Sequence, residues 1–372
     1  MTSRRLLILA IAAIVAIGAG VWLAGREGST GSSAGTGALY PELKEQLNSV
    51  SAVNMFKAGD ARVVELKKQG DDWTVSERDN YPADDAKVRK LLVALADAKV
   101  YEQKTSNPEA YATLGVEDTT SKGATSLRIE LVGAPKPVNL IIGKQGVGAR
   151  SNYVRRAGEP QSWLINATID TSSTPEAWLR KDIIDVGADR MQSATVTTKD
   201  AKPYTAAKAT RADANFNVDG LPKGKSLAAP TAANSVASAL ASLSLSDVRA
   251  ASALQSTPAA AHATFKTFDG LIVDVDGWIQ DNKHYVALRP SFDAAQAEHF
   301  KVATAPAEEK KADEKKGEAA PAAKPEEPPQ PAAPNVAEDA KKVATKVTGW
   351  VYEIPDYKYE ALFKPVEQLV GK

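Results

Sequence analysis

Two groups of residues in this sequence have types and spacings that suit the binding of ions. The first is the pair Asp274 and Asp276, which stand two positions apart in LIVDVDGWI (271–279). Alternate residues of a strand share one face, so both carboxylates are expected on one side, opposite Val273 and Val275. Two carboxylates on one face can hold a hard cation or act as an acid–base pair. A solvent-facing strand explains the same residues without a metal, so Asp274 and Asp276 are weak candidates for metal ligands.

The second group is the glycine-rich loop that begins at Gly143. Backbone amides in such a loop can face an anion, and the basic residues beside it add positive charge. The aromatic ring of a nearby tryptophan can stack on a sugar ring. The candidate ligand-binding residues are therefore Lys144, Gly146, Gly148, Arg150 and Trp163. A glycine-rich hairpin turn without a ligand, and a tryptophan packed in the core, form the alternative interpretation.

Two further motifs resemble catalytic or nucleotide-binding loops but lack the required context. Gly31 to Gly35 matches G-x-S-x-G, yet it stands in a Gly/Ser-rich segment without the strand and helix that a nucleophile elbow needs. Residues 220–226 resemble a phosphate-binding loop with three instead of four residues between the glycines, and Pro222 lacks a backbone N–H. We therefore assign no catalytic residue and no cofactor, and we expect a protein that is not an enzyme.

Composition excludes several classes of protein. The 46 basic and 46 acidic residues of this 372-residue chain cancel, whereas a nucleic-acid-binding body normally shows a basic excess. The absence of cysteine excludes disulfides, thiolate metal sites and cysteine nucleophiles. We expect no nucleic-acid partner.

The N-terminal region is typical of a membrane anchor. Residues 6–24 are 19 consecutive residues without a charge, which nearly span a bilayer as a helix. Trp22 stands where signal-peptide cleavage after Ala24 would need a small residue, so the span is expected to stay uncleaved. Basic residues precede the span, which predicts that residues 1–5 are cytoplasmic. The protein is thus expected to be single-pass in the inner membrane, with its body in the periplasm.

The chain after the anchor has a repeated organisation. Residues 25–39 are rich in Gly, Ser and Thr and are expected to form a flexible tether. Residues 40–186 then show strands, a helix and an antiparallel meander, and residues 187–372 repeat that order. In the first module the helix has an apolar stripe at Val88, Leu91, Leu92 and Leu95, and in the second at Val236, Leu240 and Leu243. The predicted fold class is α+β, with two tandem related modules, each a mostly antiparallel sheet carrying one amphipathic helix.

One segment interrupts the second module. Residues 291–346 hold seven of the chain's 21 prolines and almost no large apolar side chain. Such a segment buries too little surface to offset the entropy of ordering it, so we expect a disordered insertion rich in Pro, Ala, Lys and Glu.

The combination of motifs resembles a known bacterial family. The residues that carry the resemblance are 71–100, with a strand tryptophan and the stripe helix, then TLGVED (113–118) and LRIELVGAPKPVNLIIGK (127–144). They resemble the family called domain of unknown function 4340. The resemblance implies an exported, membrane-anchored protein, often encoded beside ABC transporter components of the gliding-motility type. It implies no catalytic residues.

The leading functional prediction is a non-enzymatic accessory or scaffold protein of the bacterial cell envelope, working with an ABC transporter permease or other inner-membrane envelope proteins. The alternative is a periplasmic module that binds a glycan or another cell-envelope ligand. A metal-assisted hydrolase built on Asp274 and Asp276 is a third hypothesis.

Overall fold

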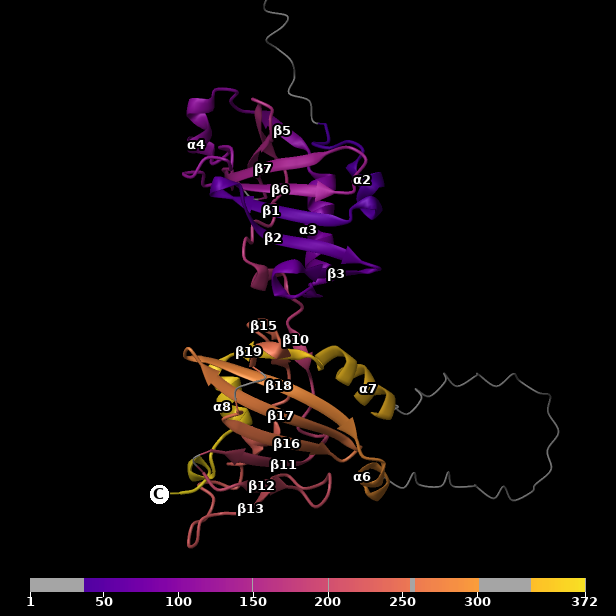
Figure 1. Cartoon of the computed structure of the whole chain (residues 1–372), viewed down its shortest axis with the longest axis vertical. Coiled ribbons are helices and arrows are strands. Elements are labelled where there is room, and N and C mark those ends of the chain that lie inside the picture. Colours follow the sequence, from indigo (N-terminus) through magenta and orange to yellow (C-terminus); the bar gives the residue numbers. More distant parts are fainter. Residues whose placement is uncertain (1–36, 149, 200, 255–257, 301–335, 372) are drawn as a thin grey trace, which may run out of the picture. The chain divides into compact units, whose positions relative to one another are not determined.

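The chain forms two compact units, and the boundary between them along the chain lies between Arg180 and Lys181. Residues 37–148, 150–199, 201–254, 258–300 and 336–371 are described by a computed structural model (Figure 1). Both units combine mainly antiparallel sheets with few helices, which confirms the predicted α+β class. The boundary lies earlier than the predicted one after residue 186, because Asp182–Ile184 already pairs with Leu243–Ser244 of the second unit.

The N-terminal predictions fall mostly outside the described residues. These are the cytoplasmic residues 1–5, the apolar span 6–24 and the tether up to residue 36. The last part of the predicted tether belongs to the folded body, because Ala38 pairs with Lys99 and Leu39 is fully buried. Among the described helices, none combines the length and the apolar character needed to cross a bilayer.

Unit 1 is built on one antiparallel sheet of nine strands in the order β4-β3-β2-β1-β6-β7-β8-β9-β5. Its strands are β1 (Ala52–Lys57), β2 (Ala61–Gln69), β3 (Asp72–Val75), β4 (Tyr81–Pro82), β5 (Val100–Gln103), β6 (Leu127–Val132), β7 (Val138–Gln145), β8 (Asn152–Arg156) and β9 (Ser162–Ile165). Apolar residues alternate along β6, so Leu127, Ile129 and Leu131 face the core.

The principal helix of unit 1 is α3 (Asp85–Asp97), which packs on the core face of the sheet. The Asp84 side chain caps it by accepting a hydrogen bond from the Lys87 amide at 3.0 Å. The predicted apolar stripe is confirmed, since Val88, Leu91, Leu92 and Leu95 are all buried. Two shorter helices are α2 (Leu43–Gln46) and α4 (Tyr111–Leu114).

Unit 1 also covers part of its second sheet face. The segment containing α4 packs Tyr111 and Val116 against the fully buried Ile141 of β7. Arg155 of β8 is also buried on this face, where its Nε donates to the Val116 carbonyl at 2.9 Å.

Unit 2 has an eight-stranded antiparallel sheet in the order β13-β12-β11-β16-β17-β18-β19-β15, and a separate pair, β10 with β14. Its strands are β10 (Asp182–Ile184), β11 (Met191–Thr198), β12 (Tyr204–Ala207), β13 (Asn217–Asp219), β14 (Leu243–Ser244), β15 (Asp247–Ala250), β16 (Ala261–Thr267), β17 (Leu271–Gln280), β18 (Lys283–Phe292) and β19 (Trp350–Ile354). Except for β4, the strand order of unit 1 corresponds to that of unit 2 strand by strand, from β3 and β13 at one end to β5 and β15 at the other.

The predicted second helix is much shorter than expected. Only α5 (Asn234–Ala237) forms there, and Leu243 lies in β14 instead. Serines interrupt this segment, and the hydroxyls of Ser235 and Ser238 bond to carbonyls three residues earlier. Such local bonds compete with a regular helix. The buried residues Val236, Leu240 and Leu243 still contribute to the core.

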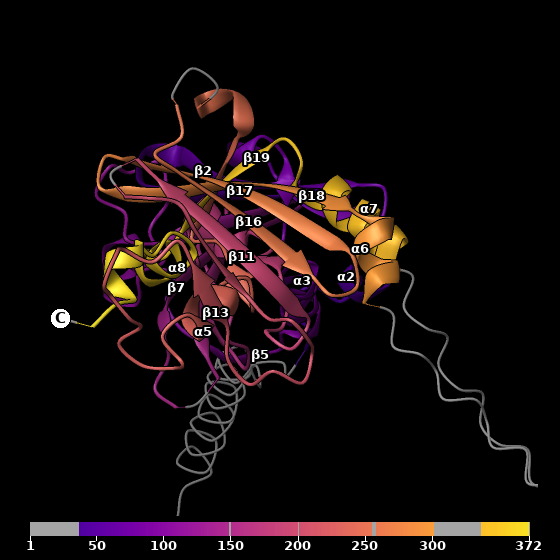
Figure 2. The ribbon, with the colours of Figure 1, turned by 90° about the horizontal axis from the view of Figure 1, so that it is seen from below.

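The predicted disordered insertion is partly ordered. Within 291–346, β18 continues to Phe292, and α6 (Ala294–His299) and α7 (Val336–Val347) follow, while residues 301–335 lie outside the described residues. Asp293 caps α6 by accepting hydrogen bonds from the amides of the first turn. The α7 helix packs against β18 through an apolar stripe that the composition of the whole segment conceals. Figure 2 shows α6 and α7 near the same end of β18.

The remaining helices are short. α8 (Asp356–Leu362) contacts β18 and α5 and buries Tyr359 and Leu362. The 3₁₀ helices are η1 (Leu47–Ser49), η2 (Ala58–Asp60), η3 (Ser76–Arg78), η4 (Pro108–Ala110), η5 (Pro175–Trp178), η6 (Ala251–Leu254) and η7 (Val366–Gln368).

Candidate functional site

The glycine-rich loop links β7 to β8, and its predicted ligand-binding residues have different roles there. Lys144 lies at the end of β7, where its Nζ donates to the carbonyls of Thr113 at 2.9 Å and Ala112 at 3.3 Å. This contact fits the tendency of cations to bind the carbonyl end of a helix. The Gly146 amide donates to the Ser151 carbonyl at 3.1 Å and closes the turn, and Gly148 has φ of 113°. These contacts give Lys144 and Gly146 structural roles.

Trp163 of β9 is half-buried rather than freely exposed. It pairs with Val154 of β8 and Gln103 of β5. Its indole N–H is buried without a hydrogen-bond acceptor among the described residues. Trp163 is therefore placed within the sheet, in the strand that pairs with β8.

Arg150 has a different environment, because it lines a hollow of about 750 Å³ in unit 1. We call this the α3 hollow. One wall is the face of α3 that carries Lys87, Lys90, Leu91 and Ala94, spaced as neighbours on one side of a helix. The opposite wall is residues 166–171, which follow β9. Of the five predicted ligand-binding residues, Arg150 alone lines this hollow.

The charges of the α3 hollow do not balance. Lys87 Nζ lies 3.4 Å from Asp170 and also donates to the Ala177 carbonyl at 2.7 Å. Burial by itself would raise the pKa of Asp170, but hydrogen bonds from Ser172 and the charge of Lys87 outweigh it and lower that pKa. Asp170 is therefore ionised and neutralises Lys87.

Lys90 and Arg150 supply the excess positive charge. Both are exposed, and neither side chain forms an ion pair or hydrogen bond within the described part of the chain. Arg150 also has φ of +64°, in the left-handed region. The other non-glycine residues with positive φ are Asp, Asn and Ser, the short polar types that tolerate it best. Arg150 thus has a strained backbone conformation and lines the α3 hollow.

The aspartate pair of unit 2 lies on one strand face, as its spacing predicts. Val273 and Val275 are buried on the opposite face. His262 of β16 bonds through Nδ1 to Asp276 at 2.8 Å. The Thr264 hydroxyl donates to Asp274 at 2.6 Å, and Arg289 of β18 donates to Asp276. We call His262, Thr264, Asp274, Asp276 and Arg289 the polar network of unit 2.

In this network, neighbouring side chains of the protein pair with the two aspartates. Burial raises the pKa of Asp276, but hydrogen bonds and positive charge from Arg289 and His262 more than compensate, so the pKa is lowered overall. Within the described ranges, no group of three or more His, Asp or Glu side chains is arranged to hold a metal ion.

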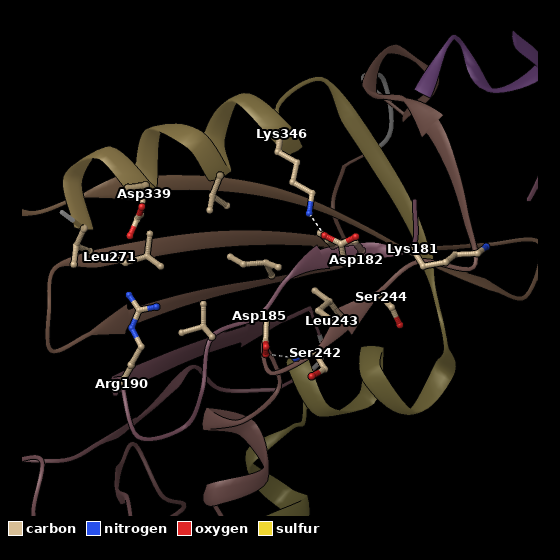
Figure 3. A pocket seen from close by; sticks show the side chains of 16 residues that line it. Lys181, Asp182, Asp185, Arg190, Ser242, Leu243, Ser244, Leu271, Asp339 and Lys346 are labelled. Atoms are coloured by element: carbon tan, nitrogen blue, oxygen red, sulfur yellow. Dashed lines mark hydrogen bonds and ion pairs between the residues drawn. The ribbon is translucent and has the colours of Figure 1, made fainter. Parts of the chain in front are cut away.

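A second hollow, of about 520 Å³, lies beneath α7 in unit 2 (Figure 3). We call it the α7 hollow. Its apolar lining comes from Val336, Ala340 and Val343 of α7 and from buried residues such as Leu243 and Leu271. This hollow was not predicted, because α7 lies in the segment expected to be disordered. The spacing of Val336, Ala340, Val343 and Val347 is the signal that identifies the helix.

Charged side chains surround the α7 hollow and are largely paired. Figure 3 shows Lys346 of α7 reaching Asp182, with which it forms an ion pair. Asp185 accepts a hydrogen bond from the Ser242 amide at 2.6 Å, and Arg190 binds Asp269 at 2.8 Å. The first contact links α7 to β10, and the second links the segments that follow β10 and precede β14.

Comparison with protein families identifies the chain. Residues 73–264, just over half of the sequence, match the model of the family described as domain of unknown function, DUF4340. The chain belongs to the DUF4340 family. The match confirms the resemblance seen in the sequence. It includes every residue that lines the α3 hollow, whereas Asp274, Asp276 and α7 lie beyond it. No curated protein and no solved structure matches the chain.

Proposed function

We propose that this DUF4340 protein is a non-enzymatic accessory or scaffold protein of the bacterial cell envelope. Residues 6–24 would anchor it in the inner membrane as a single-pass protein with a cytoplasmic N-terminus. Its two units would then lie on the periplasmic side and contact an ABC transporter permease or another inner-membrane envelope protein. The uncharged 19-residue span supports the anchor.

The corresponding strand orders support a further part of this proposal, that the two units are related tandem modules. In such a pair, one module can keep a structural or ligand-binding role while the surface of the other module changes and takes a different role. The strongest support for this divergence comes from comparing the second sheet face of unit 1 with the corresponding face of unit 2.

The main supporting observation is that this face is partly covered over β7 and β8 in unit 1, whereas polar residues of β16, β17 and β18 on the corresponding face of unit 2 are partly exposed. In unit 1, residues 104–126 link β5 to β6 and cover Ile141. The corresponding link between β15 and β16 in unit 2 is shorter, spanning residues 251–260. The side chains of His262, Asp274 and Arg289 remain 43%, 35% and 57% exposed. A broad sheet face with mixed charges suits recognition of a protein partner.

A site-specific cross-linking experiment tests this proposal. A photoreactive amino acid at Lys266, which is on the half-exposed face of β16, is compared with one at Lys223, which is in an exposed turn of the same unit. We expect the full-length protein in membranes to cross-link an inner-membrane protein from position 266 and not from 223. Recovery of no transporter or envelope protein from position 266 would contradict the proposal.

A second candidate function is a periplasmic module that binds a glycan or another cell-envelope ligand. The α3 hollow, which Arg150 lines, supports it. Titration of cell-wall fragments against the full-length protein tests this function. Loss of binding in Trp163→Ala would support the predicted aromatic platform at Trp163, and unchanged binding would contradict it.

A further inference from the structure

We propose that the α3 hollow binds the acidic group, a carboxylate or a phosphate ester, of a small organic ligand. Lys90 and Arg150 would pair with the acid, and apolar side chains of the hollow would contact the rest of the ligand. This inference does not depend on the accessory role of the protein. It deepens the second candidate function, because it specifies the chemistry of the ligand and the residues that recognise it.

The charge of the hollow is the first argument. Three cationic side chains and one carboxylate line it, and the carboxylate of Asp170 is 3.4 Å from Lys87. This pairing leaves Lys90 and Arg150 as two cations with no partner among the described residues. Two uncompensated cations at one cavity attract an anion, and a planar guanidinium can bind a carboxylate or phosphate through two parallel hydrogen bonds.

The shape and lining of the hollow are the second argument. Its volume of about 750 Å³ lies within the range of small-molecule sites. Leu91 and Ile169 form an almost fully buried part of its lining, and the half-buried Ala94 and Ala167 add apolar surface. Neutral polar groups also face it, including Asn166, whose side-chain oxygen accepts a bond from the Lys99 amide and leaves the NH₂ group as a donor. The lining thus combines apolar contact, neutral donors and positive charge.

The backbone of Arg150 is the third argument. A left-handed conformation costs an arginine roughly 1–2 kcal/mol that a glycine would not lose. Residues 146 and 148 of the same turn are glycines, so glycine is compatible with this loop. Strained non-glycine residues cluster at binding and catalytic sites. A long cationic side chain that lines a hollow with excess positive charge, at a backbone position that glycine would adopt without strain, supports a role in ligand contact.

Ligand-dependent thermal unfolding and calorimetric titration of the full-length protein in detergent test the proposal. The probes are inorganic phosphate, D-glucuronate and neutral D-glucose at low ionic strength. We expect phosphate or glucuronate to raise the unfolding midpoint and to bind measurably, and glucose to do neither. Binding of phosphate alone assigns the site to phosphate esters, and binding of glucuronate alone assigns it to carboxylates. Binding of neither acid overturns the proposal.

Variants then locate the binding site. Lys90→Gln and Arg150→Gln should each weaken acid binding about tenfold, as expected for loss of one charge-assisted contact. Arg89→Gln is the matched control, since it removes the same charge from the neighbouring position of α3 and Arg89 does not line the hollow. Equal weakening in all three variants would indicate unspecific attraction and overturn the proposal. Failure of cell-wall fragments to bind would reject the polymer ligand but leave small-acid binding intact, so the two tests are distinct.

Discussion

Ile141 in β7 and Asp276 in β17 occupy corresponding positions in the two sheets. Each pairs with the residue two positions beyond a tyrosine of the following strand, Tyr153 in β8 or Tyr285 in β18. Ile141 is fully buried beneath Tyr111, whereas Asp276 is bonded to neighbouring strands and partly exposed. The same sheet position therefore serves as apolar core in one unit and as part of a polar surface in the other.

The first prediction concerns that difference. Ile141→Asp should destabilise unit 1 by about 3–5 kcal/mol, because it places an unpaired charge in a fully buried site. Urea unfolding followed by tryptophan fluorescence measures the loss. Ile279→Asp is the control, since Ile279 is 58% exposed at the end of β17 and should change stability by less than about 0.5 kcal/mol. Similar losses in both variants would show that burial does not distinguish the sites.

The second prediction concerns the contact between β7 and α4. Gly143→Ala should cost about 1–3 kcal/mol, because the added Cβ would lie only 2.3 Å from the Leu114 carbonyl oxygen and backbone must move. Gly123→Ala is the control, as its Cβ would meet nothing within 4 Å. Denaturant midpoints of the two variants give the comparison. If Gly143→Ala left the denaturant midpoint unchanged, α4 would not be held close to β7.

The third prediction is a pH dependence in unit 2. The folded-state pKa of Asp276 is lowered, so its stabilising contribution is present above the unfolded pKa near 4 and is lost as the pH falls through the folded value. Asp276→Asn should therefore be less stable than the wild type at pH 7, with the difference disappearing at low pH. Unfolding midpoints between pH 7 and pH 2 measure it. A difference that stays constant across this range would refute the assignment, and Asp281→Asn in the exposed β17–β18 turn serves as control.

The fourth prediction separates strain from binding at Arg150. Arg150→Gly should be more stable than Arg150→Ala by about 1 kcal/mol, because alanine keeps the cost of positive φ and glycine does not. Both variants should lose binding of the acidic probes. Chemical denaturation and calorimetry give the two readouts. Greater stability of the alanine variant would show that the left-handed conformation is not maintained in solution.

Much of this fold could be predicted from local sequence patterns. Alternation placed Asp274 and Asp276 on one face of a strand. The helical stripe identified α3. These features depend on residues that are neighbours in the chain, where the spacing of apolar side chains directly reports which face is buried.

Other features depend on distant contacts and could not be predicted in this way. The central strand β1 was missed because its burial comes from pairing with β2 and β6 on its two sides. The role of Lys144 depends on carbonyls of α4, more than 30 residues earlier, so its charge alone suggested a ligand. Arg150 was a candidate because of its loop, but Lys87 and Lys90, which line the same hollow, were not, since they come from the helix and not from the loop.

The position of β15 has a consequence for how unit 2 assembles. Among the described strands, β15 pairs only with β19, and the chain must pass through α6, residues 301–335 and α7 before β19 is synthesised. In unit 1 the corresponding strand, β5, pairs with β9, and a shorter stretch of chain separates these two strands. Long separation between pairing strands slows folding and prolongs exposure of unpaired edges. Unit 2 should therefore complete its sheet last, and a chain interrupted before residue 350 would keep an open edge that invites aggregation or chaperone binding.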